Sequence, residues 1–215
     1  MVNSPPIIET VLTDEWVKVT WEDFLTFADD PSLSNGKFYF DEGYMMIEIS
    51  PLGSAHGQVH SIIANLIILY AAIKNIPIKS LINTSFRKFG IRGCQPDIAF
   101  YIGDNCTLPP WNNAPVDLDR IDAPSLVIEI ASYSLEDDCS RKQKLYQRLG
   151  VKEYWVIDVN KMRVIANNFM IKEGSLITES KVLPGLEMKL IELVLQKSQT
   201  EDDSTINRWL LAKFS

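Results

Sequence analysis

Two carboxylates beside short apolar runs are the residues of this chain best suited to chemistry. Asp97 stands directly before the run Ile98–Ile102, and Glu129 interrupts the run Leu126–Ala131. Short runs rich in Val, Ile and aromatic side chains predict buried strands. Because an ionised carboxylate inside such a strand is costly unless a cation or a metal compensates it, Glu129 in particular indicates a functional site.

The two carboxylates suit a divalent metal. If their strands are neighbours, about 4.8 Å apart, Asp97 and Glu129 would share one ion, and the carbonyl oxygen of Ile130 would add a ligand. Mg²⁺ prefers oxygen ligands and keeps several waters, so one or two carboxylates are enough; Mn²⁺ accepts the same ligands. An ion of this kind lowers the pKa of its bound water, so the pair suits a metal-assisted reaction.

A lysine lies on the helix expected after the Glu129 strand. Asp138, Lys142 and Tyr146 recur every fourth residue and would share one face of a helix from about Asp138 to Leu149. The Lys142 ammonium, carried on its long stem, would then stabilise charge that develops beside the carboxylates. The alternative is a solvated Asp138–Lys142 ion pair, an ordinary feature of exposed helix faces worth about 0.2–0.5 kcal/mol.

The elements that must position these residues alternate between helices and strands. Periodicity and turn residues predict, in order, a helix from Thr20 to about Ala28, a hairpin over 37–50, a helix over about 54–74, strands at 78–82, 85–89 and 97–102, a proline-rich loop over 103–124, the Glu129 strand, the Asp138 helix, strands at 154–158, 161–171 and 174–183, and a final helical region containing a helix that begins near Asp203. This order predicts an α/β fold with a mixed sheet flanked by helices.

The ordered set of residues resembles the Uma-type family of restriction-endonuclease-like proteins, a domain of unknown function in the PD-(D/E)XK nuclease superfamily. The matching pieces, over roughly residues 35–185, are Ser50-Pro51 with Gly53 and His56, then Pro96-Asp97, Ile128–Ser132, the Asp138–Lys142–Tyr146 series and Gly150–Asp158. The resemblance implies a restriction-endonuclease-like fold and metal-dependent cleavage of nucleic acid, with DNA as the substrate. It assigns Asp97, Glu129 and Lys142 to the reaction, and it implies a homodimer that reaches two strands.

Two positions depart from the pattern of these nucleases. The wider fold carries a lysine two residues after the glutamate, where this chain has Ala131, and the resemblance places the lysine at Lys142 on the following helix instead. Many family members have a glutamate in the first hairpin strand, where this chain has Tyr39. The competing hypothesis is therefore a catalytically degenerate nuclease fold that binds nucleic acid or a protein partner without cutting.

His56 and His60 lie four residues apart on the long predicted helix. This spacing is found in zinc sites, but no Glu follows His56 as the H-E-x-x-H pattern requires. His56 occupies a family position, so the resemblance implies that it faces the site.

The whole chain sets limits on these hypotheses. Its 215 residues, 46% of them hydrophobic, predict an arm and short helix over 1–34, a core domain over 35–185 and a helical extension of that domain over 186–215. The net charge of −7 argues against a surface that coats nucleic acid, but it allows a small basic groove. We expect no membrane span or signal peptide. Three cysteines without metal-type spacing favour a reducing cytoplasm.

Overall fold

The structure, a computed structural model, describes residues 13–49, 53–104, 106–171 and 175–214. The strands are β1 Val17–Lys18, β2 Lys37–Asp41, β3 Tyr44–Glu48, β4 Ile78–Ile82, β5 Phe86–Lys88, β6 Arg92–Cys94, β7 Ile98–Ile102, β8 Val116–Asp117, β9 Leu126–Ala131, β10 Glu153–Asp158, β11 Arg163–Asn168 and β12 Ser175–Leu176. The helices are α1 Trp21–Ala28, α2 Ser54–Ile73, α3 Leu135–Asp137, α4 Gln143–Leu149, α5 Met188–Lys197 and α6 Asp203–Phe214, with a 3₁₀ turn η2 at Pro31–Leu33 and a π-helical segment η3 at Asp138–Lys142.

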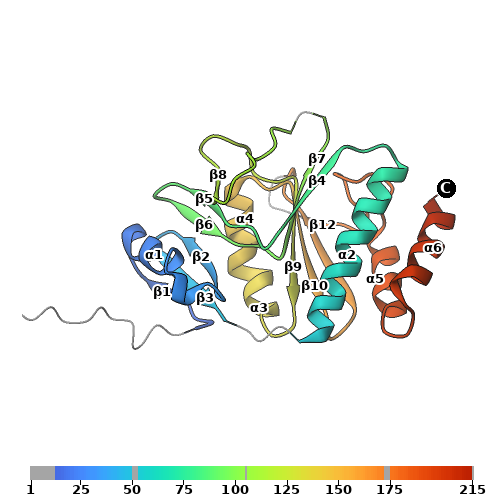
Figure 1. Ribbon diagram of the computed structural model, residues 1–215, viewed down its shortest axis with the longest axis horizontal. Helices are drawn as coiled ribbons and strands as arrows, with labels where there is room; N and C mark the ends of the chain where they lie inside the picture. The colour runs from blue at the N-terminus through green and yellow to red at the C-terminus, as the bar shows by residue number, and fades with distance from the viewer. Residues whose placement is uncertain (1–12, 50–52, 105, 172–174, 215) are drawn as a thin grey trace, which may run out of the picture.

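The strands form two six-stranded sheets rather than one. The central sheet has the order β12-β11-β10-β9-β7-β4, and the second, hairpin sheet has the order β1-β3-β2-β6-β5-β8. In the central sheet β9 and β10 are parallel, whereas β7 runs antiparallel to β9. The fold is therefore the mixed α/β arrangement that the sequence predicts, with a second sheet added to it (Figure 1).

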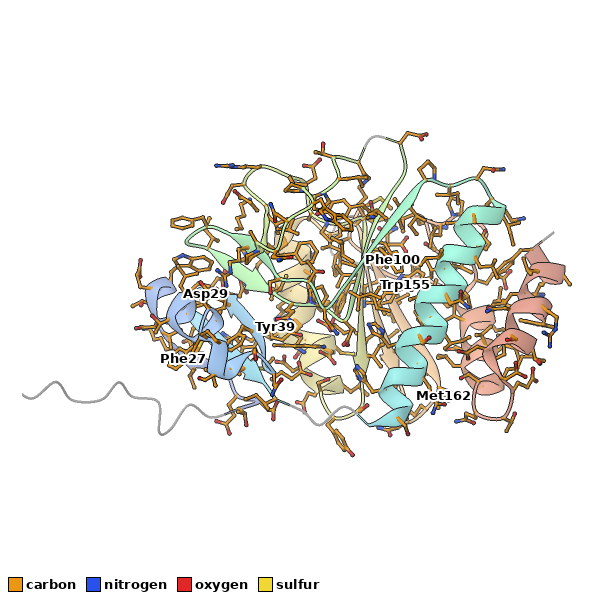
Figure 2. The ribbon with its side chains drawn as sticks, viewed as in Figure 1. Phe27, Asp29, Tyr39, Phe100, Trp155 and Met162 are labelled. Atoms are coloured by element: carbon orange, nitrogen blue, oxygen red, sulfur yellow. The ribbon has the colours of Figure 1, made fainter. Side chains whose placement is uncertain are left out.

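The central sheet separates two cores because its side chains alternate between its faces. Leu126, Ile128 and Ile130 of β9 pack with α2, α5 and α6, in the core that also holds Phe100 and Trp155 (Figure 2). The odd-numbered residues of β9 face the opposite way, toward α4 and the hairpin sheet, where the second core contains Tyr39, Tyr146 and Val127. Asp97 and Glu129 share the parity of this second face, so both lie where the hairpin sheet and α4 meet the central sheet.

Local sequence signals explain how several elements begin and turn. Thr20 caps α1 at the helix start that the sequence predicts, and its capping box with Asp23 is a further feature of the structure. The turn between β2 and β3 has positive φ at both Glu42 (51°) and Gly43 (79°), the conformation of a tight hairpin turn. This hairpin pairs Lys37 with Glu48 across its open end.

The long helix α2 belongs to the core. By length and composition alone it could cross a membrane. Eight of its side chains, between Val59 and Ala71, are nevertheless buried in the protein, so its apolar character is explained by packing.

Three predicted elements differ in the structure. The loop predicted over 103–124 contains β8, which pairs in parallel with β5 through Val116 and Asp117; a two-residue strand is too short to give a periodic signal. The strand predicted over 174–183 is reduced to β12, and Gly174 lies outside the described residues. Of the arm predicted over residues 1–13, only Thr13 lies within the described residues. The helix predicted from Asp138 to Leu149 begins at Leu135 and passes through the π-helical segment η3 before α4.

Candidate active site

The two carboxylates singled out in the sequence lie together in the structure. The backbone N–H of Asp97 donates to Oε2 of Glu129 at 3.2 Å, and the backbone N–H of Ile130 donates to Oδ2 of Asp97 at 2.8 Å. The antiparallel register of β7 and β9, which pairs Ile98 with Ile128, produces this arrangement. Asp97 is 3% exposed and Glu129 is 2% exposed. Two buried carboxylates on neighbouring strands therefore form the centre of the candidate site.

Asp97 is surrounded by cationic and polar groups. Its Oδ1 accepts from Nζ of Lys37 at 2.5 Å and lies 3.2 Å from Nε2 of His56. Nε2 of His60 lies 3.1 Å from the Asp97 carbonyl oxygen. Burial opposes the charge of Asp97, but the His56 hydrogen bond and the Lys37 charge outweigh burial and lower its pKa well below the usual range. Asp97 is therefore ionised, and His56 faces the site as the resemblance implies.

Glu129 has a different environment. Its Oε1 accepts from the hydroxyl of Tyr146 at 2.6 Å and from the hydroxyl of Tyr39 at 3.3 Å. Burial raises the pKa of Glu129 to about 8; the Lys142 charge opposes this shift and the Asp97 charge adds to it. A further cation beyond the lysines of the site would therefore be needed to keep Glu129 ionised at neutral pH.

Lys142 is buried, with 1% of its side chain exposed. Its Nζ makes ion pairs with Oε2 of Glu48 at 2.7 Å and Oδ1 of Asp138 at 2.8 Å, and it lies 4.3 Å from the centre of the Tyr39 ring. The solvated Asp138–Lys142 pair considered in the sequence analysis is therefore wrong, because Asp138 is equally buried. The two residues form their pair across the π-helical segment η3, a geometry frequent at functional sites.

The hairpin contributes two residues that sequence reasoning missed. Lys37 begins β2 and Glu48 ends β3, and the hairpin register places them opposite each other. Each then contacts one residue discussed above: Lys37 binds Asp97, and Glu48 binds Lys142. The sequence did offer a signal for this pair, because Lys37 and Glu48 are opposite charges at the two ends of the predicted hairpin. Tyr39, at the family's glutamate position, comes from the same hairpin (Figure 2), and the family residues Ser50 and Pro51 lie outside the described residues.

A cavity of about 390 Å³ adjoins Glu48. It is lined mainly by acidic and hydroxyl side chains: Asp14, Met46, Glu48, Tyr133, Ser134, Glu136, Asp137 and Ser140. Because four of these side chains are carboxylates, the cavity repels phosphate and does not provide a basic groove.

The donor set fits a divalent ion only with help from other oxygens. Within the ranges that the structure describes, no group of three or more His, Cys, Asp or Glu side chains is arranged to hold a metal. Asp97 Oδ1 already binds a cation, because the Lys37 ammonium forms an ion pair with it. The carbonyl of Ser125 accepts from the N–H of Glu153 in β10, and the carbonyl of Ala131 accepts from the N–H of Val159 directly after β10. Since successive carbonyls of a strand alternate between its edges, the Ile130 carbonyl points to the opposite edge, where Asp97 lies.

Comparison with known proteins places the chain among nuclease-like sequences and folds. The model of the Uma2 family, described as "Putative restriction endonuclease", matches residues 21–204. A solved structure of "a putative nuclease belonging to DUF820" from Anabaena variabilis ATCC 29413 resembles the fold with a TM-score of 0.54. It shares 19% sequence identity, and the alignment covers 89% of this chain and 99% of that chain. No curated protein matches the chain.

Proposed function

Because the chain belongs to the Uma2 family, we propose that it is a metal-dependent endonuclease that hydrolyses phosphodiester bonds, with DNA as the substrate. The observation that carries this proposal is the buried Asp97–Glu129 pair on neighbouring strands, linked by the hydrogen bond from the Asp97 N–H to Glu129. Two neighbouring carboxylates can bind a divalent cation, and metal-assisted hydrolysis of an anionic ester requires such a cation.

The metal would be Mg²⁺ or Mn²⁺, bound by Asp97, Glu129 and the carbonyl oxygen of Ile130. When bound, it supplies a polarised phosphate oxygen and a water of lowered pKa. Asp97 is ready for this role because its charge is already stabilised by its neighbours, whereas Glu129 gives up a proton to take part. The backbone hydrogen bonds from Asp97 to Glu129 and from Ile130 to Asp97 hold the two carboxylates in fixed orientations.

The basic side chains of the site lie at two depths. Lys37 and His56, each with 12% of the side chain exposed, border solvent beside Asp97 and can approach a phosphate. Lys142 lies deeper and acts through its charge, which favours the ionised form of Glu129. We therefore assign Lys142 to electrostatic stabilisation of the charge that develops during the reaction, and Lys37 to the approach to the substrate.

The homodimer expected from the sequence would place one site on each strand of a duplex. Light scattering at micromolar concentration tests this expectation, and a monomeric mass would contradict it. The cytoplasmic location expected from the cysteines stays a prediction.

A second candidate function is binding of nucleic acid or a protein partner without cleavage. It is favoured by Ala131 at the lysine position of the wider fold, and by the Lys37–Asp97 ion pair, which neutralises a carboxylate that a metal would need. In this alternative the buried charges stabilise one another and serve the fold alone.

A cleavage screen separates the two functions. Supercoiled and linear DNA, single-stranded DNA and RNA are incubated with the protein and Mg²⁺ or Mn²⁺, with and without a chelator. We expect metal-dependent cleavage of DNA that Asp97→Asn abolishes and that Asp203→Asn, in the exposed first turn of α6, leaves unchanged. Thermal unfolding shows that each variant is folded. Binding of nucleic acid without cleavage in either metal would favour the second function.

A further inference from the structure

The two oxygens of Glu129 have unequal partners. Oε1 accepts from two phenolic hydroxyls, Tyr146 at 2.6 Å and Tyr39 at 3.3 Å, whereas Oε2 accepts from one backbone N–H, that of Asp97, at 3.2 Å. A carboxylate oxygen offers about two lone pairs to partners. The Tyr39 hydroxyl has one proton, which it shares with the nearer carbonyl oxygen of Gln95 at 3.1 Å, so Tyr146 is the strong donor to Oε1. Oε2, the oxygen on the Asp97 side, accepts one longer hydrogen bond and keeps a lone pair for a further partner.

Both hydroxyl donors are fixed by their surroundings. The Tyr146 ring is buried and stacks on Tyr154, with ring centres 5.0 Å apart and an interplanar angle of 28°. The Tyr39 hydroxyl also lies 3.1 Å from the carbonyl oxygen of Gln95, and its ring lies beneath the Lys142 ammonium. The side chain of Glu129 thus has little freedom to rotate.

We propose that Tyr146, assisted by Tyr39, is a positioning residue that makes Glu129 bind the metal through Oε2 alone and so favours small octahedral ions over Ca²⁺. The inference rests on the metal site of the proposed function and adds the mode of binding. Mg²⁺ demands near-ideal octahedral geometry, whereas Ca²⁺ accepts bidentate carboxylates and six to eight oxygens. A Glu129 that turned to bind through both oxygens would disturb the short Tyr146 hydrogen bond that holds Oε1.

Titration of metal into wild-type protein and matched tyrosine variants tests the proposal. Tyr146→Phe removes only the hydroxyl at Glu129. Tyr154→Phe is the matched control, because Tyr154 stacks on Tyr146. The Tyr154 hydroxyl donates to the carbonyl oxygen of Asp138 and not to Glu129. Calorimetric Kd values for Mn²⁺ and Ca²⁺ are measured for each protein at one pH, with the unfolding midpoint as a check of folding.

We expect Tyr146→Phe to weaken Mn²⁺ binding by about 10–100-fold, the usual effect of losing a partner of a metal ligand, and to reduce the preference for Mn²⁺ over Ca²⁺. Tyr154→Phe should leave both constants within about twofold, a size far below that effect. Tyr39→Phe, which removes the longer hydrogen bond, should give an intermediate loss, and it replaces Tyr146→Phe if that variant does not fold.

The outcomes distinguish the inference from the proposed function. If the wild type binds Mn²⁺ and Tyr146→Phe binds it equally well with the same ion preference, the inference is wrong and the metal site stands. Equal losses in Tyr146→Phe and Tyr154→Phe would also overturn it, because they would reflect packing. A wild type that binds no Mn²⁺ contradicts both.

Discussion

Replacing Lys142 with methionine tests how the charges beneath the site are balanced. Methionine keeps an unbranched side chain of similar length but removes the ammonium. In the wild type this ammonium is 1% exposed and lies 2.7 Å from Glu48 and 2.8 Å from Asp138. The variant would leave these two carboxylates, and Glu129 above them, without their shared cation.

The expected loss is large because burial prevents water from replacing the cation. Removing one partner of a buried ion pair typically costs about 3–5 kcal/mol, whereas an exposed pair contributes about 0–1 kcal/mol. Glu48 retains some contact with solvent, so we expect Lys142→Met to lower the free energy of unfolding by about 3 kcal/mol, the lower end of that range. The partly exposed i,i+4 pair between Lys197 and Glu201, also 2.8 Å long, provides the control, and Lys197→Met should cost about 1 kcal/mol or less.

The loss should also depend on pH. Burial raises the pKa of Glu129 and Asp138 in the folded protein, and the Lys142 charge opposes that rise. Without Lys142 both values rise further above the unfolded ones, so the folded variant binds more protons than the unfolded chain over a wider pH range. Wild type and variant bind the extra protons alike until the wild-type groups ionise, so the stability of the variant relative to wild type falls as pH rises through the folded wild-type pKa values, which are raised for Asp138 and reach about 8 for Glu129.

Urea unfolding of wild type, Lys142→Met and Lys197→Met at pH 5.5 and pH 8.5 measures both effects. The expected result is a deficit for Lys142→Met that is larger at pH 8.5, with little change for Lys197→Met at either pH. A Lys142→Met deficit as small as that of Lys197→Met, or one equal at the two pH values, would refute the reasoning.

Three further predictions concern other buried groups. Glu153 is fully buried and accepts two backbone N–H groups and two side-chain donors, so Glu153→Gln should lower the unfolding free energy by about 2–3 kcal/mol in urea titrations; a loss below about 0.5 kcal/mol would contradict this role. A Cβ at Gly93 would lie 2.5 Å from the Phe24 ring, so Gly93→Ala should cost about 1–3 kcal/mol, and an unchanged unfolding midpoint would show that the ring moves freely. Because the pKa of Glu129 is raised to about 8, Mn²⁺ binding at pH 7 should release a proton, and affinity should increase with pH up to about 8; calorimetry in two buffers of different ionisation enthalpy measures the proton, and no net release would contradict the shift.

The centre of the candidate site could be predicted because its residues break a local pattern. Asp97 and Glu129 stand beside or within apolar strand runs, and the cost of burying a charge indicates that they need compensation wherever the strands lie. The structure brings them together on neighbouring strands. The α/β class, the first hairpin, α1 and α2 likewise follow from periodicity and capping signals that act within a few residues.

The surroundings of these carboxylates could not be predicted because they depend on distant contacts. Lys37 meets Asp97 from 60 residues away, and Glu48 meets Lys142 from 94 residues away. Helical periodicity correctly places Lys142 on one face with Asp138, but it does not say that the hairpin covers this face. The second sheet was missed for the same reason, since it is completed by short strands whose partners are far apart in the sequence.

Anomalous diffraction from crystals grown with Mn²⁺ tests the central claim most directly, because it locates the ion without relying on activity. The account predicts one Mn²⁺ peak in direct contact with a carboxylate oxygen of Asp97 and with Oε2 of Glu129, and with the Lys37 ammonium moved off Asp97 Oδ1. A peak bound elsewhere, or a fully occupied Lys37–Asp97 ion pair at saturating Mn²⁺, would contradict the claim that these two carboxylates hold the catalytic metal.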